Sequence, residues 1–98
     1  HGYSKALSTE LGKFGIRVNV VSPGFSKGRR FEELVKIMAK EKNNSITIAR
    51  KNLISLIPLG KLIDTEDVAN AILFLASPKS RMITGSEIKV DGGRSKHI

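Results

Sequence analysis

The sequence has 98 residues, a formal net charge of +8, 40% hydrophobic residues and no cysteine. This length suits one small domain or a piece of a larger one, and the hydrophobic content indicates a globular chain. The missing cysteines exclude disulfides and thiolate chemistry, and no apolar run approaches the roughly 18 residues that a membrane span needs. The composition therefore fits a cytoplasmic protein that does not span a membrane.

The ends of the chain carry little chemistry. The two histidines, His1 and His97, stand at the termini, so we expect no metal site and no histidine general base. The sequence begins without Met, inside a stretch that reads as a helix. We therefore expect a fragment or a processed piece, and we expect the polar residues 94–98 to fray.

Residues 1–14 predict a helix, which Gly12 and Gly15 would end. Its expected buried stripe consists of Ala6, Leu7, Leu11 and Phe14. Residues 16–22 follow as a β-branched run that Pro23 and Gly24 stop, which predicts a buried strand. Alternation places Arg17 and Asn19 on one face of this strand, and we expect hydrogen bonds there to form a structural tie rather than a catalytic site.

Residues 25–57 read as a helical insertion. Phe31, Leu34, Val35 and Met38 have the spacing of an amphipathic helix, and Ser45 is a candidate N-cap for a second one. Residues 26–51 carry eight basic and three acidic side chains, which is +5 of the net charge. This basic stretch is either a solvated helical face or a surface for an anionic partner, and we rank nucleic acid low because the sequence has no nucleic-acid-binding motif.

The last third predicts a helix and a strand. Asp64 is the expected N-cap of a helix over residues 65–76, which would bury Val68, Ala69, Ile72, Leu73 and Ala76. Residues 87–91 alternate as a strand, and Gly92 ends it. Two strands joined through a helix predict a parallel crossover. Because parallel strands need both faces and both edges covered, we expect the first strand to have a neighbour outside this chain.

Four ordered motifs resemble the C-terminal third of a classical short-chain dehydrogenase/reductase. They read ELGKFGIRVNVVSPG at residues 10–24, IPLGK at 57–61, EDVANAILFLAS at 66–77 and ITGSEIKVDGG at 83–93. The resemblance implies an α/β fold, namely the C-terminal fragment of a Rossmann-type doubly wound parallel sheet with its last two strands, lid helices and flanking helices. Residues 1–98 would be part of one NAD(P)-binding domain, with residues 25–57 as the substrate lid.

The resemblance also implies site residues. Pro23, Gly24, Phe25 and Ser26 would form one wall of the NAD or NADP site, and the lid would present Phe31, Leu34 and Met38 to the substrate. The family often has a Thr where this chain has Gly28, and Ser26 or the pair Arg29 and Arg30 would have to compensate.

No catalytic residue is expected in this chain. The family's catalytic Tyr-x-x-x-Lys motif and glycine-rich loop would precede it. Tyr3 and Lys5 stand two residues apart, so on a helix they point in different directions and cannot reproduce that motif.

The leading hypothesis is an NAD(P)-dependent oxidoreductase that moves hydride between nicotinamide and a small-molecule carbonyl or alcohol, anionic or carrier-linked. The intact enzyme would be a homo-oligomer, and the 98-residue chain alone would be inactive. The alternatives are a non-enzymatic remnant or oligomerisation module and, ranked below it, a basic nucleic-acid-binding piece.

Overall fold

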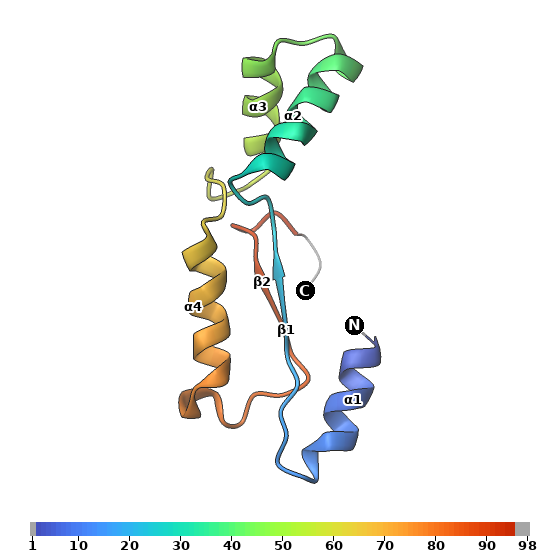
Figure 1. Ribbon diagram of the computed structural model, residues 1–98, viewed down its shortest axis with the longest axis vertical. Helices are drawn as coiled ribbons and strands as arrows, with labels where there is room; N and C mark the ends of the chain where they lie inside the picture. The colour runs from blue at the N-terminus through green and yellow to red at the C-terminus, as the bar shows by residue number, and fades with distance from the viewer. Residues whose placement is uncertain (1, 96–98) are drawn as a thin grey trace.

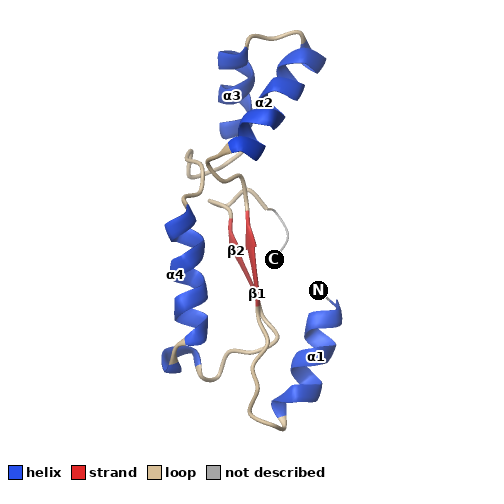
Figure 2. Ribbon diagram, viewed as in Figure 1, coloured by secondary structure: helices blue, strands red, loops and turns tan. Residues whose placement is uncertain are grey.

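A computed structural model describes residues 2–95, so His1 and His97 lie outside the described part. The chain is elongated, with extents of 54 × 24 × 22 Å. A helical hairpin projects from one end of a strand pair, one helix lies along that pair, and the N-terminal helix lies at the opposite end (Figures 1 and 2). The elements in chain order are α1 (Gly2–Gly12), β1 (Val20–Pro23), α2 (Arg29–Lys42), α3 (Ile46–Ile54), α4 (Thr65–Ala76), the 3-10 turn η1 (Pro78–Ser80) and β2 (Glu87–Val90).

The two strands pair in parallel, as the crossover pattern predicted. Val20 aligns with Glu87, and Pro23 aligns with Val90. Strand β1 begins at Val20 rather than at Ile16, so its predicted start was wrong. Before Val20 the backbone pairing is incomplete: the Val18 carbonyl accepts from the Gly85 N–H at 2.8 Å, but the Val18 N–H donates to the Thr84 hydroxyl at 3.1 Å.

Arg17 and Asn19 tie this extended segment to the loop that precedes β2. The Asn19 amide donates to the Ile83 carbonyl at 3.0 Å and accepts from the Ser86 N–H at 3.0 Å. One Arg17 nitrogen donates to the carbonyls of Ser80, at 3.0 Å, and Ile83, at 3.2 Å. These bonds confirm the expected structural tie.

Helices α2 and α3 form a helical hairpin, a packed unit with its own core. It lies within the segment predicted to be a substrate lid, and we call it the lid hairpin. Five buried side chains make up this core, namely Phe31, Val35, Ala39, Ala49 and Leu53. Asn43 ends α2 in the left-handed conformation, and the Ser45 hydroxyl accepts from the Ile48 N–H as the predicted N-cap of α3. The predicted stripe of Phe31, Leu34, Val35 and Met38 therefore packs within the hairpin. Of the stripe expected for α3, Ala49 and Leu53 are buried, whereas Ile46 and Leu56 are exposed.

Helix α4 begins as predicted but buries much less than predicted. The Asp64 N–H donates to the Asp67 carboxylate at 2.9 Å, which stabilises the first turn. Leu75 is the buried residue of this helix, and Val68 is half-buried. The predicted burial of Ala69, Ile72, Leu73 and Ala76 was wrong, because two four-residue strands offer α4 only a narrow surface.

Helix α1 shows the same shortfall. Phe14 and Ala6 are exposed, whereas the buried residue is Ser8, whose hydroxyl donates to the Lys5 carbonyl. The expected stripe was therefore wrong at Ala6 and Phe14, whereas Leu7 and Leu11 are half-buried. Within residues 2–95, no helix combines the length and the apolar content that crossing a membrane requires.

Candidate functional site

A cleft of about 340 Å³ lies where the strand pair meets the lid hairpin. All four residues predicted for the cofactor wall line it, and they follow directly from the end of β1. Its lining consists of Pro23, Gly24, Phe25, Ser26, Arg30, Phe31 and Leu34. The cleft is thus bounded by the carboxyl end of a parallel strand, the edge at which open α/β sheets bind ligands.

The backbone from Gly24 to Lys27 is held on two sides. The Gly24 N–H donates to the Val90 carbonyl at 2.9 Å, so strand pairing continues past Pro23. The Phe25 carbonyl accepts from the Ile63 N–H at 2.8 Å, and the Lys27 N–H donates to the Ile63 carbonyl at 3.0 Å. Among the described residues, none accepts from the N–H groups of Phe25 and Ser26. These two donors remain available to a ligand.

Gly24 is required by close packing. A Cβ on Gly24 would stand 2.7 Å from the Asp91 Cβ and 2.8 Å from its Cα, closer than such atoms approach in proteins. The Asp91 carboxylate in turn accepts from the N–H groups of Gly93, at 2.9 Å, and Ser95, at 3.0 Å. The wall of the cleft therefore rests on the turn that follows β2.

Aromatic contacts fix Phe25. Its ring lies 5.6 Å from the Phe31 ring, centroid to centroid. The Arg94 guanidinium lies 4.1 Å from its centroid, a cation–π contact. The predicted fraying was wrong for residues 94 and 95, which both make specific contacts. The sequence could not predict the contact of Arg94, because Phe25 is some 70 positions away in the chain. Residues 96–98 lie outside the described part.

The three predicted lid residues do not share one site. Phe31 and Leu34 line the cleft, but Met38 lines a separate cavity of about 300 Å³ inside the hairpin. The lining of that cavity is Met38, Lys42, Asn44, Ala49, Asn52, Leu53 and Leu56. The structure thus places Met38 one helical turn beyond the cleft, among residues of the lid core.

Carboxylates neutralise most of the basic residues near the cleft. Lys27 pairs with Asp64 at 3.1 Å, Arg29 pairs with Glu33 at 3.1 Å, and Arg50 pairs with Glu32. The hydrogen bond from Arg50 lowers the pKa of Glu32 below its ordinary value of 4.5 and raises the pKa of Arg50.

Arg30 differs from these neighbours. It lines the cleft, and its side chain makes no ion pair or hydrogen bond with any residue in the described range 2–95. Gly28, where the family often has Thr, has φ +139° and supplies no hydroxyl. Charge at this end of the cleft therefore comes from Arg30 alone among the residues that line it.

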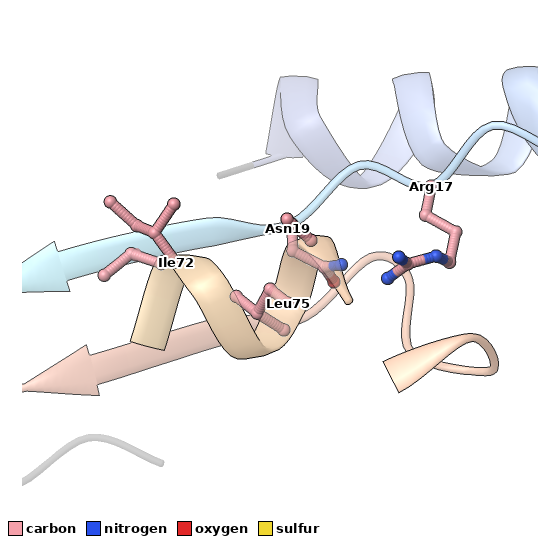
Figure 3. Close-up of a pocket in the computed structure, with 6 residues that line it drawn as sticks. Arg17, Asn19, Ile72 and Leu75 are labelled. Atoms are coloured by element: carbon pink, nitrogen blue, oxygen red, sulfur yellow. The ribbon is translucent and has the colours of Figure 1, made fainter. Parts of the chain in front are cut away.

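A second cavity, of about 470 Å³, lies between β1 and α4. Figure 3 shows Arg17 and Asn19 entering it from the segment that leads into β1, and Ile72 and Leu75 entering it from α4. The polar groups of Arg17 and Asn19 already bond to the loop before β2. Its remaining lining is apolar, and the hydrogen bonds of Arg17 and Asn19 go to the loop before β2, which suits packing rather than catalysis.

Tyr3 and Lys5 lie outside both cavities. Tyr3 is 81% exposed, and the Lys5 amine donates to the Gly85 carbonyl at 3.4 Å. That the pair forms no catalytic motif stays a prediction.

Comparisons with known proteins define the class. The family model described as Enoyl-(Acyl carrier protein) reductase matches residues 1–95. The solved structure of YwfH, an NADPH-dependent reductase involved in bacilysin biosynthesis, superposes with a TM-score of 0.87 at 34% identity, covering 99% of this chain and 37% of that one. The fold is therefore an α/β, Rossmann-like fold of the kind that oxidoreductases use.

Two curated relatives are similar in sequence. The 3-oxoacyl-(acyl-carrier-protein) reductase FabG of Rickettsia felis is 42% identical over 94% of this chain and 34% of its own length. Subunit BbsD of (2S)-((R)-hydroxy(phenyl)methyl)succinyl-CoA dehydrogenase from Thauera aromatica is 39% identical over 96% of this chain and 34% of its own length. The chain belongs to the short-chain dehydrogenase/reductase family, and it spans about a third of the length of these relatives.

Proposed function

We propose that this chain is the C-terminal part of an NAD(P)-dependent oxidoreductase that moves hydride between a nicotinamide and a carbonyl or alcohol. The observation that carries the proposal is the cleft at the end of β1, which gathers Pro23, Gly24, Phe25 and Ser26 under the first turns of α2. In this assignment, residues 23–26 form one wall of the nicotinamide pocket and residues 25–57 form the substrate lid.

The groups in the cleft suit a nicotinamide. Its flat ring would pack on the apolar walls supplied by Pro23 and Phe25. Its carboxamide needs hydrogen-bond partners, and the unused N–H groups of Phe25 and Ser26 are donors for the carboxamide oxygen. When bound, the cofactor would supply the hydride. The residues of this chain would orient the ring and exclude water from its face, and the proton would come from a residue elsewhere in the enzyme.

The substrate is proposed to be anionic or carrier-linked. Two relatives carry names that specify acyl-carrier-protein and coenzyme A substrates. The net charge of +5 over residues 26–51 supports the same class, since a positive field attracts anionic ligands to the mouth of the cleft.

Assembly is the second role that we propose. Ile72, Leu73 and Phe74 are 51%, 66% and 47% exposed on α4, and among the described residues β1 and β2 pair only with each other. Large exposed apolar residues beside open strand edges favour burial against further protein. We propose that the rest of the same domain covers the free edge of β1 and that α4 contributes to a homo-oligomer. A non-enzymatic oligomerisation module would use the same surfaces.

The test compares the activity of the protein at its natural length with that of the 98-residue chain. The protein at its natural length should oxidise NADPH or NADH when mixed with a panel of ketones and thioester-linked carbonyl compounds, whereas the 98-residue chain should give no turnover above background. Turnover by the 98-residue chain, or its absence at natural length with every compound, would refute the assignment.

Two variants test whether the dinucleotide binds in the cleft. Phe25→Ala should weaken binding of the dinucleotide, because it removes an apolar wall. Phe14→Ala, at an exposed position outside the cleft, should leave that binding unchanged. Equal dinucleotide affinities in both variants would contradict the placement of the nicotinamide.

A further inference from the structure

Arg30 occupies an unusual position among the basic residues of this chain. It is the second residue of α2, and it lines the cleft beside Phe31 and Leu34. The other residues of the lining are apolar side chains, Gly24 and Ser26, and the Ser26 hydroxyl already points back to the Gly24 carbonyl at 3.5 Å. A full positive charge thus faces a cleft that is otherwise uncharged.

The nearest acidic residues are engaged elsewhere. Glu33 binds Arg29, and Glu32 binds Arg50. The hydrogen bond between Glu32 and Arg50 also keeps that carboxylate ionised and committed to Arg50. No described residue neutralises Arg30, although each of its basic neighbours Lys27, Arg29 and Arg50 has a carboxylate partner. Among Lys27, Arg29, Arg30 and Arg50, Arg30 is the one without a carboxylate partner in the described residues, and it is also the one that lines the cleft.

The surroundings of Arg30 can admit a ligand group. A Cβ placed on Gly28 would meet no atom within 4 Å, so the approach to the first turn of α2 is open. Arg30 is exposed, so an anionic group can reach its guanidinium from solvent. The guanidinium also presents a planar fork of donors that matches the oxygens of a phosphate or carboxylate.

We propose that Arg30 is a specificity residue that binds an oxyanion, a phosphate or a carboxylate, carried by the substrate. This inference rests on the proposed function, since it assigns the ligand that the lid covers. Residues 23–26, on the strand side, form the wall proposed for the nicotinamide. Arg30, Phe31 and Leu34 stand on the lid side, so the group that Arg30 meets belongs to the substrate.

The experiment uses the protein at its natural length and the substitution Arg30→Gln. Three reducible carbonyl compounds of similar size are compared, one with a phosphate, one with a carboxylate and one uncharged. Arg30→Gln should raise KM for at least one anionic compound by roughly tenfold to a hundredfold, the range expected for a lost charge-assisted pair, and should leave KM for the uncharged compound within about twofold. Which anionic compound responds distinguishes phosphate from carboxylate.

Arg29→Gln is the matched control, because Arg29 is exposed and already paired with Glu33. It should leave all three KM values unchanged. Arg30→Lys keeps the charge without the planar fork and should give an intermediate KM, and it also serves if Arg30→Gln fails to fold. Equal effects of Arg29→Gln and Arg30→Gln, or no effect of either, would overturn the proposal.

Two binding measurements separate the remaining outcomes. The dissociation constant of the reduced dinucleotide, measured without substrate, should be the same in wild type and Arg30→Gln. A higher dissociation constant in Arg30→Gln with an unchanged substrate KM would assign Arg30 to the cofactor and overturn the substrate assignment. Calorimetric binding of the phosphorylated and carboxylated compounds reads the Arg30 contact without turnover. If wild type binds them through Arg30 but reduces no carbonyl compound, the oxidoreductase assignment fails while the oxyanion site stands.

Discussion

The lid hairpin and the strand unit, defined as β1, β2 and α4, bury their apolar side chains to very different extents. The hairpin encloses five buried side chains between two helices, including the fully buried Val35. In the strand unit, α4 buries Leu75 and leaves Ile72, Leu73 and Phe74 exposed. The hairpin therefore has a buried core of its own, although Ile37, Ile46 and Ile48 are exposed on its outer surface. The strand unit has no comparable core among the described residues, and its apolar surface is available to further protein.

The cleft lies at the junction of these two regions and takes one side from each. Its strand side is held by backbone bonds to Val90 and Ile63, and its lid side is held by the hairpin core through Phe31. A change inside the hairpin should therefore alter the lid without breaking the strand pair, and a change in the strand pair should displace the wall. The variants below test this separation, from the largest expected effect to the smallest.

Leu53→Ala should produce the largest effect. Leu53 is 7% exposed in the hairpin core, and removing a buried leucine side chain costs about 2–5 kcal/mol. Hydrogen exchange should show faster exchange of the amides in α2 and α3, with the amides of β1 and β2 unchanged. Leu56→Ala is the matched control, since Leu56 is 54% exposed and should change exchange little. Equal exchange in the two variants would mean that the hairpin is not an independent packed unit.

Gly24→Ala tests the strand side. The added Cβ would collide with Asp91, and overpacking of this kind costs about 1–3 kcal/mol. We expect a lower melting temperature together with weaker dinucleotide binding, because the wall must move. Gly12→Ala adds the same methyl group at the end of α1, where nothing lies within 4 Å, and should not lower stability. If Gly24→Ala behaves like Gly12→Ala, the close packing of Gly24 on Asp91 is not what holds the wall.

The same contrast explains how far the sequence could predict this structure. Within the hairpin, spacing and capping gave the correct helices, because α2 and α3 pack on each other and Ser45 caps locally. In the strand unit, periodicity identified the apolar face of α4 but could not say whether anything covers it. The predicted burial of Ile72 and Leu73 failed for this reason, because burial depends on which other residues pack against the helix.

In the candidate site, the sequence predicted residues that are neighbours in the chain but not contacts between distant parts of it. Pro23, Gly24, Phe25 and Ser26 are consecutive, so a resemblance over one motif was enough to predict them as a group, and the structure does gather them. The contacts of Ile63 and Arg94 with the Phe25 segment join distant parts of the chain, and no local pattern marks them. The separation of Met38 from Phe31 and Leu34 likewise depends on how far α2 extends past the cleft.

Asn19→Ala should have a smaller effect, confined to the strand unit. It leaves the Ser86 N–H and the Ile83 carbonyl without these partners, which costs about 1–2 kcal/mol for a partly buried pair of bonds. We expect faster hydrogen exchange in β2 and unchanged exchange in the hairpin. Asn70→Ala, on the exposed side of α4, is the control and should be neutral or slightly stabilising because Ala has the higher helix propensity. Faster exchange in α3 after Asn19→Ala would show that the two regions are coupled.

Glu32→Gln should have the smallest effect, and its sign depends on pH. The Arg50 hydrogen bond lowers the pKa of Glu32 below 4.5 in the folded protein, so the pair stabilises the hairpin fully above the unfolded-state value and loses that contribution as pH falls through the lower folded-state value. Near pH 7, Glu32→Gln should therefore shift the denaturation midpoint slightly downward, and the shift should vanish in acid.

High salt should also shrink this shift, because Glu32 and Arg50 are 45% and 38% exposed and solvent ions screen the pair. Glu41→Gln is the control, since Glu41 is exposed and makes no ion pair with a described residue. A shift for Glu32→Gln that persists in acid would point to side-chain packing rather than charge. If Glu32 also restrained Arg30, wild type would have a larger KM for anionic substrates than Glu32→Gln, but the pairing of Glu32 with Arg50 argues against this. We therefore expect equal KM values in wild type and Glu32→Gln, with Arg30 as the cation that faces the substrate.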